Sequence, residues 1–139
     1  MMLYLVQWMR SLIFAVQMYF AMTVIAFFGA PISLLRTDYA CVVVRLFCNY
    51  VTWSASWIIG LQTEIRGEPP SGEILIAAKH QSFLDVIMIV SKTPQPKFIM
   101  KSSLIYMPII GFYARRIGCI PVKRGRRSEA CLLYTSDAA

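Results

Sequence analysis

The sequence of 139 residues is long enough for one modest domain, but its composition differs from that of an ordinary soluble protein. Apolar residues make up 58% of the chain and charged residues only 15%, where soluble domains have about 25% charged residues. Of the 21 charged residues, only four precede Glu64. This asymmetry excludes a uniformly soluble domain and predicts a membrane segment followed by a more polar one.

The net charge of +7 comes mainly from the end of the chain. Residues 115–127 contain six cations and no acid, a pattern that attracts anionic phospholipid head groups or a phosphate-bearing ligand. Nucleic acid is the other common partner of a basic run, and the preceding membrane segment disfavours it. We therefore expect a membrane phospholipid and no nucleic acid among the partners.

Cysteine and histidine usage argues against a metal centre. The four cysteines form no C-x-x-C pair, and the chain has a single histidine, so a zinc site of the common types lacks its ligands. The cysteines are interpreted as small apolar residues of a reduced protein. No metal is predicted.

Two apolar stretches dominate the first half of the chain. The uncharged run of 20 residues at 11–30 would form a helix about 30 Å long, which matches the hydrocarbon thickness of a bilayer. A membrane helix is predicted there, and a secretory signal peptide is the alternative. The second stretch, 41–61, includes Arg45, Trp53 and Trp57, which is compatible with a second span or, slightly better, with a helix at the membrane surface.

The stretch "RGEPPSGE" at 66–73 breaks any helix and marks a boundary. After it, short apolar runs predict strands at 73–78, 96–101 and 119–124. Helices are predicted between them, at 82–92 with an apolar face of Phe83, Val86, Ile87 and Val90, and at 103–118 with a break near Pro108. Strands that alternate with helices are typical of an α/β layer.

The stretch "AAKHQSFLDV" at 77–86 holds the single histidine, His80, five residues before Asp85. The two side chains can meet if His80 lies in the turn before a helix, with Ser82 near its N-cap and Asp85 reaching back from its first turns. The carboxylate would then fix the imidazole tautomer, and His80 would act as a general base on a hydroxyl of the substrate. The alternative is purely structural: Ser82 and Asp85 cap the helix, and the backbone satisfies His80.

This stretch resembles the first block, H-x-x-x-x-D, of the glycerolipid acyltransferase family. The segment "GFYARRIGCIPVKRG" at 111–125 is similar to the second block of that family, with Gly118, Ile120 and Arg124 at its glycine, strand and arginine positions. The intervening "KFIMKSSLIYMPIIG" resembles the linking segment. The likeness covers roughly residues 60–128, and two blocks at the proper separation are more specific than either alone.

The resemblance implies a role for each matching residue. His80 would deprotonate the free hydroxyl of 1-acylglycerol 3-phosphate, oriented by Asp85, and the product would be phosphatidic acid. The acyl donor would be the thioester of acyl-CoA or acyl carrier protein, with no further cofactor. Arg124, assisted by Lys123, would hold the acceptor phosphate, and Gly118 belongs to the same substrate-binding block. Lys79 stands where the family commonly has asparagine, and it either approaches the phosphate or is a tolerated variant.

Two other functions stay open. One is acyl transfer to a different acceptor, such as glycerol 3-phosphate or a lyso-amino-lipid. The other is a basic membrane protein that binds lipid without chemistry.

The resemblance also implies a domain plan and a location. Residues 1–62 would anchor the chain through one or more membrane helices, 63–128 would form the first half of an α/β acyltransferase domain, and 129–139 would be irregular. The third block of the family, of the Phe-Pro-Glu-Gly-Thr-Arg type, does not occur in the sequence, so an incomplete acceptor site is expected. The expected location is the inner or cytoplasmic membrane, with the site facing the cytoplasm.

Overall fold

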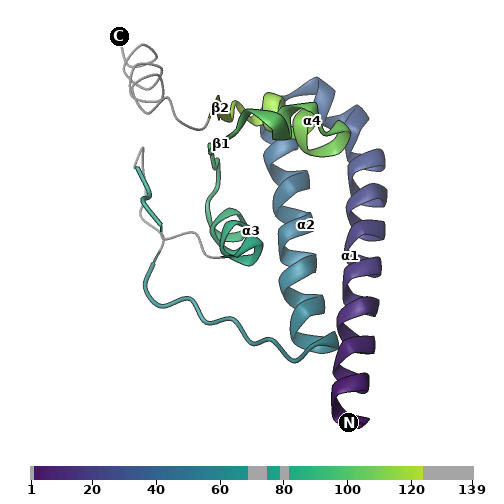
Figure 1. Cartoon of the computed structure of the whole chain (residues 1–139). Coiled ribbons are helices and arrows are strands. Elements are labelled where there is room, and N and C mark those ends of the chain that lie inside the picture. Colours follow the sequence, from purple (N-terminus) through teal and green to yellow (C-terminus); the bar gives the residue numbers. More distant parts are fainter. Residues whose placement is uncertain (1, 69–74, 79–81, 124–139) are drawn as a thin grey trace. The chain divides into compact units, whose positions relative to one another are not determined.

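The computed structural model describes residues 2–68, 75–78 and 82–123 (Figure 1). The chain divides into two compact units, Met1–Pro96 and Lys97–Ala139. The first unit contains three α-helices, and the second contains a two-stranded sheet with the helical segments that connect its strands.

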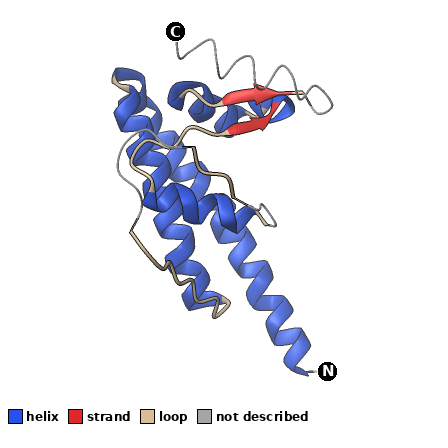
Figure 2. Ribbon diagram, turned by 90° about the vertical axis from the view of Figure 1, so that its left-hand side faces the viewer, coloured by secondary structure: helices blue, strands red, loops and turns tan. Residues whose placement is uncertain are grey.

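The first unit is built on a pair of long antiparallel helices. Helix α1 (Met2–Leu35) and helix α2 (Thr37–Ile58) lie side by side and are joined at Arg36 (Figures 1 and 2). Both predicted apolar helices are confirmed. Helix α1 is longer than the uncharged run predicts, because it begins near the N-terminus and continues through Pro31.

The contact between α1 and α2 is made by small residues and a few hydrogen bonds. The buried positions of α1 are Ala26, Gly29 and Ser33, which allow the neighbouring backbone to come close. Gln17 of α1 donates to the hydroxyl of Ser54 at 3.1 Å and accepts from the hydroxyl of Tyr50 at 2.6 Å. These three polar side chains therefore fix how the two helices pair.

The charges at the two ends of α2 complement its dipole. Asp38 lies in the first turn of α2, where a negative charge is favourable. At the other end, Arg10 of α1 donates from Nε to the carbonyl of Ile58 at 2.5 Å. A cation there compensates carbonyls that lack partners within the helix.

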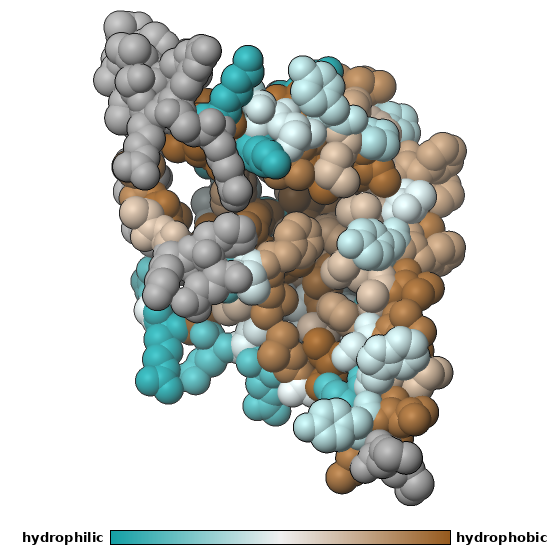
Figure 3. All heavy atoms as spheres, in the orientation of Figure 1, coloured by the Kyte–Doolittle hydropathy of each residue, from teal (hydrophilic) through white to brown (hydrophobic). Residues whose placement is uncertain are grey.

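The outer surface of α1 is apolar. Large apolar side chains remain exposed along its length, among them Leu5, Trp8, Phe20, Phe27 and Leu35. In Figure 3 much of the surface along the right-hand side, over α1, is brown or tan, with paler residues among it. Within the part of the chain that the structure describes, one helix, Leu3–Leu35, is long and apolar enough to cross a membrane.

Helix α3 (Phe83–Lys92) packs against α2 in the same unit. Ile87 and Val90 are buried, as the predicted apolar face requires, whereas Phe83 is 57% exposed. After the helix, Gln95 donates to the carboxylate of Asp38 at 3.3 Å. The prediction of a helix at 82–92 is confirmed, with one residue of its apolar face on the surface.

The second unit is a β-helix-β arrangement. Strands β1 (Ile99–Lys101) and β2 (Ile120–Val122) pair in parallel, as the two red arrows in Figure 2 show. Between them run the 3-10 helix η1 (Ser102–Tyr106) and helix α4 (Pro108–Ile117). Pro108 occupies the first turn of α4, where its missing N–H costs nothing, so the predicted break falls at this residue.

The strand predicted at 73–78 is wrong for its described part. Residues 75–78 form no strand and are exposed, with Leu75 at 70%. An apolar run becomes a strand only when a neighbour accepts its backbone hydrogen bonds, and the described sheet consists of β1 and β2 alone. The α/β prediction is therefore confirmed only in part: the described chain is mostly helical, with one small parallel sheet.

Candidate functional site

Helix α3 begins at Phe83, three residues after His80 in the sequence, and Ser82 and Asp85 cap its first turn. Ser82 is the N-cap residue and has extended backbone angles, φ −144° and ψ 163°. Its backbone N–H donates to Oδ2 of Asp85 at 2.7 Å, and its hydroxyl donates to Oδ1 at 3.4 Å. Asp85 therefore reaches back from the first turn of α3 to the residue where the helix begins.

This geometry has a structural and a chemical consequence. The carboxylate satisfies a backbone donor and lies at the positive end of the helix dipole, so it stabilises the start of α3. A carboxylate can accept about four hydrogen bonds, and the N–H and hydroxyl of Ser82 account for two of those to Asp85. Asp85 as a residue is half-buried, and its two hydrogen bonds with Ser82 lie on the exposed side of the helix start. The predicted positions of Ser82 and Asp85 at the helix start are confirmed.

Three of the predicted site residues lie outside the described part of the chain: Lys79, His80 and Arg124. Their proposed roles stay predictions. Asp85 belongs to the first unit, whereas Gly118 and Lys123 belong to the second, and each is described within its own unit.

Helix α3 is held by its buried face, and this fixes the direction of its N-terminal turn. Ile87 and Val90 have 3% and 4% of their surface exposed. At the other end, the N–H of Thr93 donates to the carbonyl of Ile89 at 3.0 Å and closes the last turn. The Asp85 carboxylate is thus mounted on an element that packing and caps hold at both ends.

A lysine lies at or directly after the carboxyl end of each strand. Lys101 is the last residue of β1 and pairs in register with Val122, and Lys123 follows Val122 directly. Both lysines are exposed. Ligands of open parallel sheets bind beside the carboxyl ends of the strands, so this edge suits an anion. The sequence argument included Lys123 and missed Lys101, which the parallel register of the strands would have revealed.

Gly118 has a conformational role in the structure. Its φ of +84° lies in the left-handed region, and its N–H donates to the carbonyl of Ala114 at 3.1 Å. It therefore ends α4 in the manner typical of glycine and turns the chain into β2. Its predicted contact with substrate stays a prediction.

Cys119, beside Gly118, is poorly suited to act as a nucleophile. Burial raises the pKa of its thiol above the ordinary value, and a hydrogen bond with the Phe98 backbone opposes this only in part. A raised pKa keeps the sulfur in its protonated, weakly nucleophilic form at neutral pH. Among the described residues, no group of three or more His, Cys, Asp or Glu side chains is placed to hold a metal ion.

Comparison with known proteins identifies similar sequences over most of the chain. Residues 62–136 match the family model described as Acyltransferase. The chain is 31% identical over 103 residues to a chloroplastic 1-acyl-sn-glycerol-3-phosphate acyltransferase of Brassica napus. The aligned region covers 69% of this chain and 29% of that relative. It is 34% identical over 67 residues to a chloroplastic 1-acyl-sn-glycerol-3-phosphate acyltransferase of Arabidopsis thaliana, which covers 48% of this chain and 18% of the relative.

The matched regions thus span less than a third of either relative. No solved structure matches the chain.

Proposed function

Because the chain belongs to the glycerolipid acyltransferase family, we propose that it transfers an acyl group from acyl-CoA or acyl carrier protein to 1-acylglycerol 3-phosphate, forming phosphatidic acid. One observation supports the proposal most directly. The Asp85 carboxylate reaches back to the start of α3, where its Oδ2 lies 2.7 Å from the backbone nitrogen of Ser82. Ser82 is two residues after His80 in the sequence. The names of both relatives give the same acceptor.

In the proposed reaction His80 is the general base. Its imidazole takes the proton of the acceptor hydroxyl while the oxygen attacks the thioester carbonyl, so a C–O bond forms. The tetrahedral intermediate collapses, the C–S bond breaks, and the imidazolium returns the proton to the leaving thiolate. Asp85 would hold the tautomer of His80 and stabilise the transient positive charge.

The acceptor phosphate would be bound by cations at or after the carboxyl ends of the two strands. Arg124 and Lys123 come directly after β2, and Lys101 ends the neighbouring strand. A guanidinium offers a fork of donors that fits a phosphate, whereas lysine contributes a point charge. Lys79 would add a cation next to the base, and Gly118 would place β2 through the turn it forms.

No covalent acyl-enzyme is part of this proposal. The attacking oxygen belongs to the acceptor. Cys119 is the described cysteine nearest in sequence to Arg124, and burial raises the pKa of its thiol. Direct transfer between the two substrates requires only a base and a place for each ligand.

The reaction would take place at a membrane surface, because the acceptor and the product are both lipids. The exposed apolar surface of α1 supports anchoring of the chain in a bilayer. We propose the inner or cytoplasmic membrane as its location, with the base on the cytoplasmic side where the thioester donors occur.

The test is formation of phosphatidic acid from radiolabelled acyl-CoA and 1-acylglycerol 3-phosphate by membranes that contain the protein. Where the gene encodes residues beyond Ala139, the longer product is assayed as well. His80→Ala should lower turnover by roughly 10²-fold or more, the usual contribution of a general base. Gln81→Ala, one residue further along, is the matched control and should retain turnover. Unchanged turnover in the His80 variant would contradict the assignment of the base, and lipid binding without turnover would favour a non-catalytic lipid-binding protein.

A further inference from the structure

The second unit contains a pocket that the proposed reaction does not use. It lies between η1 and α4 and has a volume of about 440 Å³, which is within the range of sites for small ligands. Its lining is apolar and aromatic along η1 and the start of α4 and basic at the end of α4, and it comprises Ile105, Tyr106, Met107, Pro108, Gly111, Phe112, Arg115 and Arg116. It is thus amphipathic.

Gly111 lines the pocket at the point where η1 and α4 approach each other at their backbones. A Cβ atom at this position would lie 1.9 Å from the carbonyl oxygen of Ile105, so no side chain fits. The N–H of Gly111 donates to the carbonyl of Met107 at 2.7 Å and fixes the first turn of α4. The missing side chain at Gly111 therefore allows the close approach of η1 and α4, the two elements that line the pocket.

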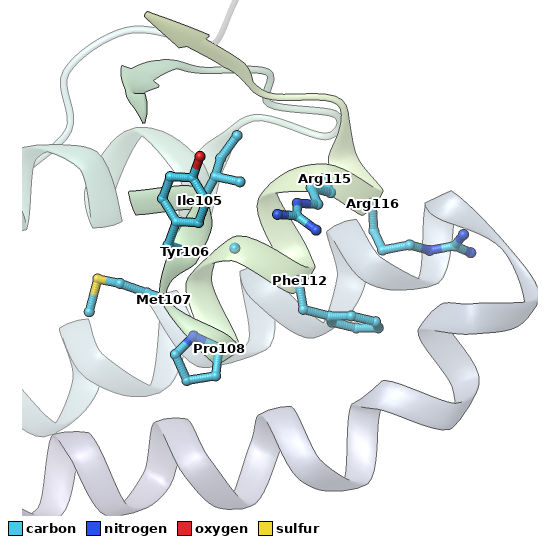
Figure 4. A pocket seen from close by; sticks show the side chains of 8 residues that line it. Ile105, Tyr106, Met107, Pro108, Phe112, Arg115 and Arg116 are labelled. Atoms are coloured by element: carbon cyan, nitrogen blue, oxygen red, sulfur yellow. The ribbon is translucent and has the colours of Figure 1, made fainter. Parts of the chain in front are cut away.

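Two polar side chains, those of Arg115 and Tyr106, line the same pocket as Gly111. In Figure 4 the guanidinium of Arg115 extends toward the side of α4 where Ile105 and Tyr106 lie, whereas Arg116 and Phe112 extend away from it. Tyr106 is 84% exposed and carries its hydroxyl at the tip of the ring. A guanidinium and a phenol hydroxyl can both donate hydrogen bonds, so the two side chains suit an anion placed between them.

The charge of the surrounding sequence favours the same ligand. Residues 97–123 include five cations, Lys97, Lys101, Arg115, Arg116 and Lys123, and no aspartate or glutamate. A patch of one sign attracts the opposite charge and raises its local concentration. The apolar side of the pocket adds a second requirement, because exposed Met107 and Pro108 offer nothing to a fully hydrated ion.

We infer that this pocket binds one anionic membrane phospholipid, with its phosphate between Arg115 and Tyr106 and the first carbons of an acyl chain against Met107 and Pro108. Arginine binds phosphate through two parallel hydrogen bonds, and tyrosine lies well where a polar and an apolar phase meet. The inference requires neither His80 nor an acyl donor. It assigns to α4 a lipid contact of its own, separate from acyl transfer.

The test measures lipid binding to the full chain in micelles of a non-ionic detergent, without an acyl donor. The probes are phosphatidylglycerol, phosphatidylcholine and inorganic phosphate, and retention of each is followed by native mass spectrometry or equilibrium dialysis. Arg115→Gln should weaken the binding of phosphatidylglycerol about tenfold, the order expected for one charged hydrogen-bond donor. Lys97→Gln removes the same charge from the same unit without touching the pocket, and it should change the affinity less than about twofold.

Three outcomes would overturn the inference. Equal weakening by Arg115→Gln and Lys97→Gln would mean that diffuse charge attracts the lipid. Equal affinity for phosphatidylcholine and phosphatidylglycerol would remove the anionic preference. Displacement of the lipid by inorganic phosphate at the concentration where phosphate binds alone would make this a site for free phosphate. Because Arg115 is exposed, its substitution leaves the fold intact, and hydrogen exchange of the α4 amides checks this.

Discussion

The Asp85 carboxylate caps α3 and is also the proposed partner of His80, and two substitutions can separate these roles. Asp85→Asn keeps an oxygen that accepts from the Ser82 N–H but removes the negative charge that an imidazolium needs. We expect it to lower acyl transfer by roughly 10²-fold or more while α3 stays folded. Ser82→Ala loses only the hydroxyl of the cap, so it should cost about 1 kcal/mol of local stability and retain turnover.

The measurement pairs initial rates of phosphatidic acid formation with hydrogen exchange of the α3 amides. If both variants lose turnover in proportion to the loss of protection in α3, the function of Asp85 is structural, and the proposal for His80 loses its support.

Of Gly111 and Gly118 in the second unit, Gly111 is the position where an added side chain would be tolerated less. The alanine Cβ of Gly111→Ala would press on backbone atoms of Ile105, which cannot rotate away as a side chain could. We expect a cost of about 1–3 kcal/mol or more, seen as faster hydrogen exchange in β1 and β2. Gly118→Ala is the comparison, because its Cβ would strain a φ of +84° but meet only the Lys97 side chain, at 3.9 Å, and it should cost about 1–2 kcal/mol without displacing η1. Unchanged exchange in Gly111→Ala would contradict the close approach of η1 and α4.

At the scale of elements, one glutamine of α1, Gln17, makes two of the hydrogen bonds that join α1 to α2. Gln17→Leu removes the acceptor of the Tyr50 hydroxyl and the donor to Ser54, and it should destabilise the helix pair by about 1 kcal/mol. Adding Tyr50→Phe removes the hydroxyl that lost its acceptor, so the double variant should recover part of the loss. Thermal unfolding in micelles measures both. A double variant less stable than Gln17→Leu alone would show that the hydrogen bonds do not act together.

At the scale of the whole molecule, we propose that the exposed apolar surface of α1 attaches the chain to the membrane. Phe20 and Phe27 are 70% and 74% exposed, and the pair Phe20→Lys/Phe27→Lys places two cations where we propose that lipid lies. Each lysine near the centre of a membrane helix costs about 2.5–3.5 kcal/mol of insertion free energy, so much of the protein should become extractable by alkaline carbonate. Gln62→Lys/Thr63→Lys adds the same charge to the exposed loop after α2 and should leave it in the pellet. Equal extraction of the two variants would falsify the membrane role of α1.

The division into an anchor at 1–62 and an acyltransferase segment at 63–128 remains a proposal at this scale. The structural units divide the chain by packing, because α3 lies against α2 in the first unit. The family match, by contrast, begins at residue 62. Packing and family likeness thus describe different properties of the same chain.

Local patterns allowed the helices to be predicted from sequence. Long apolar runs predict α1 and α2, and Ser82 followed by Asp85 predicts the start of α3, because caps act between residues three apart. The run at 73–78 failed because a strand depends on a distant partner, and residues 75–78 have none in the described sheet. For the same reason the sequence did not point to Lys101. Only the register of β1 and β2 places it at the same end of the sheet as Lys123.

The sequence by itself therefore determined the apolar character of the first half, the spacing of His80 and Asp85, and the likeness to the acyltransferases, since each depends on residue type and order. Tertiary structure alone decided which small residues α1 buries against α2, why Gly111 must lack a side chain, and that Arg115 and Tyr106 flank one pocket. The physical reason is distance along the chain. Hydropathy and capping act within a few residues, whereas close backbone approach and cavity shape arise only when separate elements pack together.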